Sequence, residues 1–239
     1  MKNRFIDRFD VILLDMGRTF MFGVDRFSDS EDYGATYRRI GGRVLSSRTV
    51  SGVISRLFDK MLRDSRNPDF YDRFAPVLSY LRAIPELKDL AESELGLLER
   101  VFALQEIGTI SSTHAEVLRR LRETHRLGIV SNIWSKADLF LKELERAKVR
   151  SLFDVIVFSS RYGRIKPSPY LFTKAIEAFD APRSKIVFVG DSLKRDVAGA
   201  KRVSLSAVWI RRDTSEFDQN LPGPDLVVRD LRDLLEGNV

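Results

Sequence analysis

Short apolar runs alternate with longer amphipathic stretches over much of the chain. The apolar runs, each bounded by turn residues, occupy residues 11–14, 127–130, 153–158, 186–189, 206–210 and 226–228. Runs of this kind are typical of the buried strands of a parallel sheet. The stretches between the later runs have apolar residues at three- and four-residue spacing, which indicates helices. The pattern therefore predicts an α/β fold with a doubly wound, Rossmann-like parallel sheet.

The helices between the strands are expected at defined places. Ser112 or Thr113 is expected to cap a helix that runs to residue 122, and Ser135 is expected to open another that runs to about residue 148. Further helices are predicted from residue 167 to 179, over residues 193–203 and after residue 228.

The stretch from residue 23 to residue 110 has a different character. It contains helical patterns at residues 50–62, 74–84 and 87–104, separated by turn signals, and no convincing strand. We therefore predict an α/β core domain formed by residues 1–22 and 111–239, with a helical cap domain at residues 23–110. Such a cap would exclude water and select the substrate, as lids do.

Four of the predicted strands lead to a reactive residue. Asp15, Ser131 and Asp191 follow their strands directly, and Lys166 follows the strand at residues 153–158. In open parallel sheets, ligands bind in the crevice beyond the carboxyl ends of the strands. If these strands are neighbours, the four side chains converge there. This set suits attack by a carboxylate on a phosphorylated or otherwise activated substrate beside a divalent cation.

Composition limits the functions to be considered. The 239 residues are 44% hydrophobic, which suffices for a substantial core, and no apolar run approaches the ~20 residues that a membrane span needs. The absence of cysteine excludes disulfides, a thiol nucleophile and thiolate metal sites. The net charge of +6 comes from basic residues that alternate with acidic ones along helices. We expect a soluble cytoplasmic protein with no nucleic-acid or membrane partner; the pattern carries no signal of its oligomeric state.

The reactive segments, in this order, resemble the motifs of the haloacid dehalogenase superfamily, in the group with a helical cap between the first and second motifs. The segments are Asp15-Met-Gly-Arg-Thr19, Ser131-Asn132, Lys166-Pro167 and Gly190-Asp191-Ser-Leu-Lys-Arg-Asp196. The resemblance implies a hydrolase that acts on a small, anionic substrate.

The resemblance also implies a role for each matched residue. Asp15 would be the nucleophile, and Thr19 would support its loop and orient it. Ser131 would donate a hydrogen bond to a substrate oxygen, and Lys166 would offset the crowding of negative charge. The expected substrate-binding set is Ser131, Asn132, Lys166 and Arg18.

A magnesium site is implied by the same motifs. Asp15 and Asp191 would be direct ligands, together with the backbone carbonyl of Gly17. Asp196 would act in the outer shell or through water. Mg²⁺ is therefore the expected cofactor.

Gly17 departs from the family pattern. Family phosphatases have a second aspartate there, which protonates the leaving group and later activates water. General acid–base catalysis contributes roughly 10²–10⁴-fold to a rate. The neighbouring Arg18 is always protonated and cannot act as the base.

Three interpretations follow from Gly17. The favoured one is a magnesium-dependent phosphatase that acts through an aspartyl-phosphate, with the missing acid supplied elsewhere; Asp25, Asp29, Glu31 and Asp32 are the candidates. The second is a dehalogenase-like or phosphonatase-like hydrolase, the latter needing Lys60 or Lys88 for a Schiff base. The third is a catalytically impaired protein that binds a metal ion and anions.

Overall fold

A six-stranded parallel sheet forms the centre of the molecule. The computed structural model describes residues 4–212 and 218–236. Its strands are β1 (Val11–Leu14), β2 (Arg126–Ser131), β3 (Phe153–Phe158), β4 (Ile186–Gly190), β5 (Ser206–Ile210) and β6 (Leu226–Val228). They lie in the order β3-β2-β1-β4-β5-β6, and all neighbours are parallel. The predicted doubly wound α/β fold is confirmed. Because β2 and β4 flank β1, the sheet has its topological switch point beside β1.

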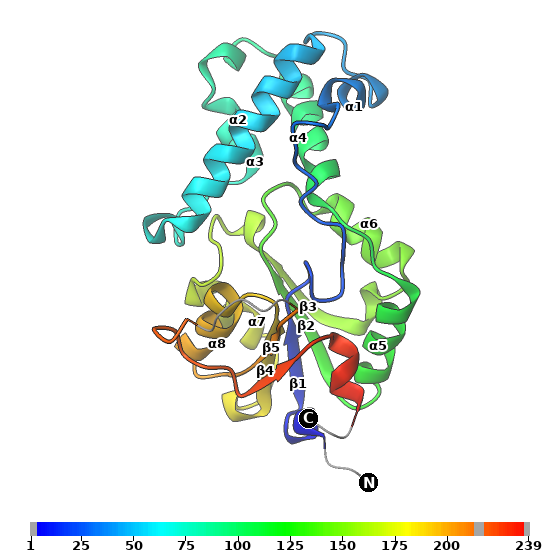
Figure 1. Ribbon diagram of the computed structural model, residues 1–239, viewed down its shortest axis with the longest axis vertical. Coiled ribbons are helices and arrows are strands. Elements are labelled where there is room, and N and C mark those ends of the chain that lie inside the picture. The colour runs from blue at the N-terminus through cyan, green and yellow to red at the C-terminus, as the bar shows by residue number, and fades with distance from the viewer. Residues whose placement is uncertain (1–3, 213–217, 237–239) are drawn as a thin grey trace.

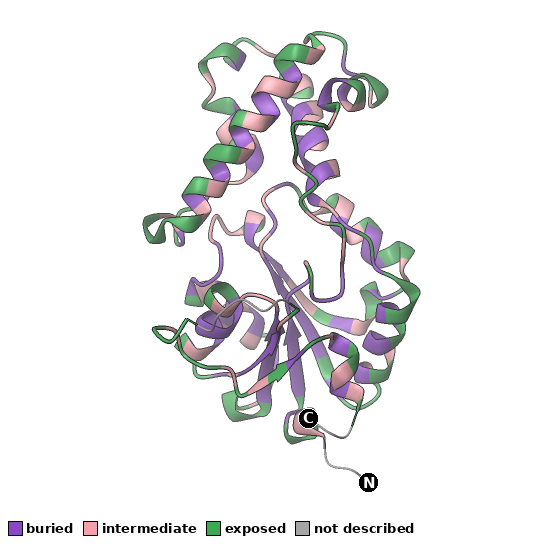
Figure 2. Cartoon of the chain, in the orientation of Figure 1, coloured by how far each residue is buried: buried purple, intermediate pink, exposed green. Residues whose placement is uncertain are grey.

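Helices cover both faces of this sheet (Figure 1). One face packs on α5 (Ser112–Arg122) and α6 (Asp138–Arg146), and the other on α7 (Pro169–Ile176) and α8 (Ala198–Arg202). Successive side chains of a strand point to opposite faces. Accordingly, Ile12 and Leu14 belong to the first apolar cluster, whereas Val11 and Leu13 belong to the second. The central strands β1 and β4 are buried throughout, whereas the edge strands β3 and β6 are partly exposed (Figure 2).

The inserted helical segment, residues 23–110, lies beyond the carboxyl ends of the strands (Figure 1). Its helices are α1 (Tyr33–Arg39), α2 (Ser47–Arg66), α3 (Val77–Arg82) and α4 (Glu92–Glu106). They pack around an apolar cluster of their own, with Tyr37, Leu57 and Phe102 among its buried members. A separate cluster is what an inserted domain requires. The domain boundaries remain a prediction, and part of the predicted core range lies outside the described residues.

Two chain segments link the inserted helices to the sheet, and they run antiparallel beside each other. Phe22 and Thr109 exchange backbone hydrogen bonds of 2.9 and 2.8 Å. Gly108 is required at this crossing, because a Cβ there would lie 2.3 Å from the carbonyl oxygen of Phe22. Farther along, the amide of Asp25 donates to the carbonyl of Glu106 at 3.2 Å. The pairing thus brings Asp25 beside Glu106, although 80 residues separate them in the sequence.

Several predicted helix starts were wrong. Ser111, rather than Ser112 or Thr113, caps α5: its hydroxyl accepts from the amide of His114 at 3.2 Å. Helix α6 begins at Asp138 and not at Ser135, whose hydroxyl instead donates to Glu106. Ser135 could have capped the helix, but its side chain hydrogen-bonds to Glu106, a residue distant in the sequence, instead.

Other elements differ in length or type. The predicted helix at 193–203 is a π-helix, Leu193–Val197, followed by α8, and the last helix is a 3₁₀-helix, Leu231–Leu235. Helix α4 begins at Glu92 rather than residue 87, because Pro85–Leu87 forms a separate 3₁₀ turn. Helix α7 ends at Ile176 rather than residue 179, α3 is shorter than predicted, α2 is longer, and α1 was not predicted.

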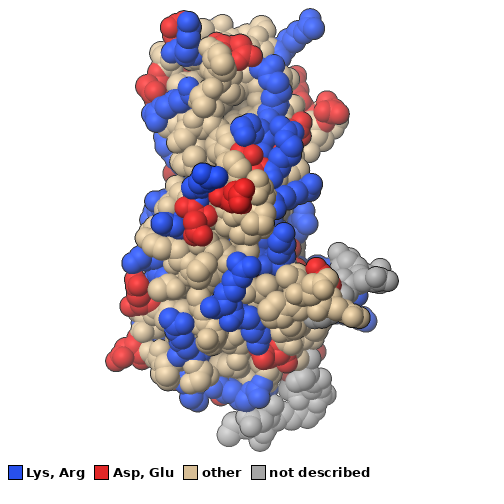
Figure 3. Space-filling view, turned by 90° about the vertical axis from the view of Figure 1, so that its left-hand side faces the viewer, with Lys and Arg blue, Asp and Glu red and all other residues tan. Residues whose placement is uncertain are grey.

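The surface is charged and mixed. On the face shown in Figure 3, Lys and Arg side chains extend from the inserted helical segment down to the core, with Asp and Glu among them. This mixture is what solvated helix faces produce, and the absence of a nucleic-acid partner stays a prediction. None of the helices within the described ranges is both long and apolar enough to cross a membrane.

Candidate active site

The predicted reactive residues meet at the switch point of the sheet. Asp15 follows β1, Ser131 ends β2 and Asp191 follows β4, while Lys166 reaches in from the loop after β3. All four line one cavity of about 530 Å³, together with Asp196 from the π-helix. The cavity lies between the sheet and the inserted helical segment, since residues from both line it.

The Asp15 carboxylate is held by two donors. Its Oδ1 accepts a hydrogen bond from Ser131 Oγ at 2.8 Å and another from Lys166 Nζ at 2.7 Å. No hydrogen bond among the described residues involves Oδ2. The side chain is largely buried, but Asp15 lines the cavity. One carboxylate oxygen is thus fixed, while the other is left to meet a ligand.

Lys166 is almost completely buried, with 2% of its surface exposed. Its Nζ lies 2.7 Å from Asp15 Oδ1 and 2.7 Å from Asp196 Oδ1. Burial alone would lower the pKa of Lys166, but these two carboxylates outweigh it and raise the pKa. The Asn132 side chain pairs with both backbone groups of Lys166, accepting from its amide at 2.8 Å and donating to its carbonyl at 3.3 Å. Asn132 therefore positions the lysine.

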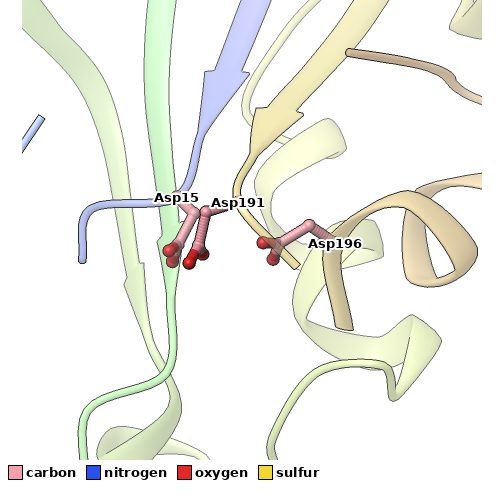
Figure 4. Close-up of side chains that lie close together, drawn as sticks. All are labelled: Asp15, Asp191 and Asp196. Carbon is pink, nitrogen blue, oxygen red and sulfur yellow. The ribbon is translucent and has the colours of Figure 1, made fainter. Parts of the chain in front are cut away.

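Asp15, Asp191 and Asp196 form a carboxylate cluster. Figure 4 shows Asp15 and Asp191 side by side, with Asp196 directed toward them from the neighbouring helix. One oxygen from each lies within 4.8 Å of the others. Asp196 Oδ2 accepts from the amide of Ser192 at 2.9 Å, which fixes it at the start of the π-helix. Burial, followed by the charges of Asp196 and Asp15, raises the pKa of Asp191.

This cluster fits a divalent cation. Three carboxylates face a single buried ammonium, so an ionised cluster carries a net negative charge that a divalent cation would neutralise. Oxygen ligands of this kind are those that magnesium prefers. Gly17 lines the cavity beside Asp15, where its backbone was predicted to contribute.

Two other predicted residues occupy different positions. Arg18 is exposed and lines the cavity. Thr19 is fully buried below the loop, and its hydroxyl has no hydrogen-bond partner within the described ranges. In the structure, Ser131 and Lys166 orient the Asp15 carboxylate, and the role of Thr19 stays a prediction.

Sequence reasoning missed Glu106, the last residue of α4. The buried carboxylate accepts from the Trp134 amide at 2.5 Å, the Ser135 amide at 3.0 Å and the Ser135 hydroxyl at 2.5 Å. Burial outweighs these donors and raises its pKa to about 7. An acidic residue in the last turn of an amphipathic helix gives no sign of such surroundings.

Most of the cavity wall was missed as well. The inserted helical segment contributes Phe58, Leu62, Ser65, Arg66 and Tyr71, and the core adds Trp134, Lys194 and Arg195. The helical period marks one face of α2 as apolar, but it does not show which turn of that helix faces the cavity.

Comparisons with known proteins show which family this chain resembles. Residues 101–210 match the model of the haloacid dehalogenase-like hydrolases. The fold is similar to that of a haloacid dehalogenase (HAD) phosphatase from Thermococcus onnurineus, with a TM-score of 0.63 and 26% identity over 95% of this chain and 98% of that one. The chain is thus similar to the haloacid dehalogenase-like hydrolases in sequence over residues 101–210 and in fold over almost its whole length. The matched region contains three of the four motifs, and Asp15 precedes it.

The curated relatives include a nucleotidase and a phosphatase by name. The chain is 31% identical to the pyrimidine 5'-nucleotidase YjjG of Escherichia coli over 59% of this chain and 63% of that protein. It is 33% identical to a phosphoserine phosphatase of Thermus thermophilus over 48% of this chain and 46% of that protein. The chain thus spans about half the length of the curated relatives it matches.

Proposed function

We propose that this protein is a magnesium-dependent phosphatase of the HAD superfamily that hydrolyses a small phosphorylated metabolite through an aspartyl-phosphate on Asp15. The observation that carries the proposal is the convergence of Asp15, Ser131, Lys166 and the two further aspartates in one cavity. The names of the curated relatives, a pyrimidine 5'-nucleotidase and a phosphoserine phosphatase, support it. Residues 23–110 would serve as the cap over the core.

The geometry suits attack by Asp15. Ser131 and Lys166 hold Oδ1, which leaves Oδ2 to bond with phosphorus as the bond to the leaving oxygen breaks. Lys166 lies next to the carboxylate and offsets the repulsion between two anions. Water then attacks the phosphorus and returns the carboxylate of Asp15, releasing phosphate.

The proposed cofactor is Mg²⁺, held by Asp15 and Asp191 with the Gly17 carbonyl, and by Asp196 in the outer shell. When bound, magnesium supplies positive charge that polarises the phosphoryl group. The chain's own contribution is to fix the carboxylates, through the Ser192 amide and the Lys166 ammonium.

The walls of the cavity support a proposal for the substrate class. They combine aromatic side chains, Phe58 and Trp134 among them, with cationic ones such as Arg66 and Arg195. Such a cavity suits a small anionic phosphate ester that carries an apolar group.

A catalytically impaired protein is the second candidate, and Gly17 is the specific observation in its favour. The Schiff-base alternative has no support in the structure. Lys60 pairs with Asp64 and Lys88 lies near Asp89, and neither lines the cavity.

The deciding experiment combines turnover with trapping. The wild type should hydrolyse p-nitrophenyl phosphate and acetyl phosphate with magnesium, and not after chelation. Beryllium fluoride with magnesium should form an adduct that mass spectrometry locates on Asp15. Asp15→Asn keeps the shape of the side chain but should abolish both results.

Two other results would each favour a different alternative. Binding of magnesium and phosphate without turnover would favour the impaired protein. Release of halide from 2-haloacids without metal would favour the dehalogenase-like alternative.

A further inference from the structure

Of the four acids considered as replacements for the missing aspartate, one faces the reaction centre. Asp25 lines the main cavity together with Asp15 and Gly17. It also lines an adjoining recess, again with Gly17 and with Ser131. Asp29, Glu31 and Asp32 line neither space, and Asp32 caps α1 by accepting from the Ala35 amide.

Val24, the residue next to Asp25, borders the space that a side chain at position 17 would occupy. A Cβ placed on Gly17 would lie 3.9 Å from Val24 Cγ2, which is an ordinary contact. The loop could therefore hold a side chain at position 17, so steric crowding does not account for the glycine. The chain segment at residues 24–25 borders the space that such a side chain would fill.

Asp25 is held in a backbone conformation that side chains disfavour. Its φ is 56°, in the left-handed region that few residues other than glycine adopt. The conformation is kept by the hydrogen bond from its amide to Glu106 and by the next residue, Arg26. The Arg26 guanidinium donates to the carbonyls of Gly23, Leu104 and Ile107. Non-glycine residues in such strained conformations cluster at functional sites.

The carboxylate of Asp25 is available to a ligand. Across residues 4–212 and 218–236, none of the hydrogen bonds or ion pairs involves it, and solvent in the cavity reaches it. Glu106, the other acid in this part of the cavity, differs: Trp134 and Ser135 already donate to both of its oxygens. Both carboxylate oxygens of Glu106 thus already accept hydrogen bonds from the protein, whereas those of Asp25 remain available to a ligand.

The surroundings of Asp25 favour its protonated form. Asp25 is exposed to solvent, yet partial desolvation of its carboxyl raises the pKa; the cations Arg18 and Arg195 oppose this rise, and the charge of Asp15 adds to it. A carboxyl with a raised pKa is better suited to donate a proton near neutral pH.

We infer that Asp25 is the general acid and base of this site, in place of the side chain absent at Gly17. The inference rests on the proposed phosphatase function. As the Asp15 Oδ2–phosphorus bond forms and the bond to the leaving oxygen breaks, that oxygen takes the proton of the Asp25 carboxyl. In the second step water attacks the phosphorus, Asp25 takes its proton, and the electron pair of the breaking bond returns to Asp15.

The test compares two esters that differ in their need for a proton. An alkyl phosphate must expel an alkoxide, whereas p-nitrophenyl phosphate releases a stable phenolate. Asp25→Asn should lower kcat/KM for the alkyl phosphate by about 100-fold and change that for p-nitrophenyl phosphate little. Adding Gly17→Asp to this variant should restore alkyl turnover. Asp29→Asn, an exposed acid of the same segment that lies outside the cavity, is the matched control and should alter neither substrate.

The outcomes separate the inference from the function on which it rests. Asp25→Asn that affects both esters equally, or neither, would overturn the role of Asp25 while phosphatase turnover stands. A wild type that cleaves neither ester and forms no adduct on Asp15 would overturn the proposed function, and this inference with it.

Discussion

Gly190, the last residue of β4, has no side chain, and this leaves room for the carboxylate of Asp196. A Cβ on this residue would lie 2.4 Å from Asp196 Oδ2 and 2.7 Å from Asp196 Cβ, closer than real contacts allow. Asp196 is packed against the backbone here and is paired with Lys166. The glycine is thus required by the carboxylate rather than by its own backbone angles.

Gly190→Ala should therefore displace Asp196 and weaken the metal site. If Asp196 supports the ligands from the outer shell, magnesium affinity should fall about 10–100-fold, as it does when such support is removed elsewhere. Calorimetric titration with magnesium measures this. Gly52→Ala is the control, since a Cβ there meets nothing within 4 Å. Unchanged affinity in Gly190→Ala would remove Asp196 from the metal site.

At the scale of single residues, the sequence predicted the convergent set but not how its members contact one another. Asp15, Ser131 and Asp191 could be placed because each follows a strand, and parallel strands end at one edge. Asn132 lines the cavity, and its predicted binding of substrate stays a prediction; the pairing of its amide with the backbone of Lys166 was not predicted. Such a contact joins loops 34 residues apart, which no local pattern encodes.

At the scale of elements, the strands were predicted well and the helix ends poorly. The strands are short and mostly apolar, and the central ones are buried on both faces, so their composition distinguishes them. Helix ends depend on side chains that have several partners to choose from. Ser135 could have capped a helix, but it donates to Glu106 at the end of α4 instead.

The link between α4 and the loop after β2 should make stability depend on pH. The Glu106 carboxyl has a pKa of about 7 in the folded protein against an ordinary value of 4.5, so the folded state binds the extra proton between these values. Stability should therefore fall as the pH rises from about 4.5 through 7, by up to about 3 kcal/mol from this group. Glu106→Gln lacks the titrating group and should not show this component.

Urea unfolding of both proteins at pH 5 and pH 8 gives the comparison. The free energy of unfolding of the wild type should decrease relative to that of Glu106→Gln between the two pH values. Parallel pH profiles would show that Glu106 keeps an ordinary pKa in the folded protein.

In the molecule as a whole, the cavity is formed jointly by the α/β core and the inserted helical segment. The sheet supplies the reactive side chains, while α2 and the turn after it supply Phe58, Leu62, Arg66 and Tyr71. The sequence predicted the insertion because its periodicity changes from strands to helices at residue 23. It could not predict which residues of the insertion line the cavity, since that depends on how two separately packed clusters are joined.

Because the inserted segment forms part of the cavity wall, we expect it to select substrates by size. Leu62→Trp adds bulk to the wall opposite the sheet without touching the reactive residues. It should lower kcat/KM roughly tenfold for bulky phosphate esters, because a filled pocket typically discriminates by 1–3 kcal/mol. Acetyl phosphate, which needs little of the cavity, should be hydrolysed almost as before. Ser79→Trp places the same side chain on an exposed position of α3 outside the cavity and should affect neither substrate. Equal loss on small and bulky substrates in Leu62→Trp would mean that the wall supports the reaction centre rather than selecting what reaches it.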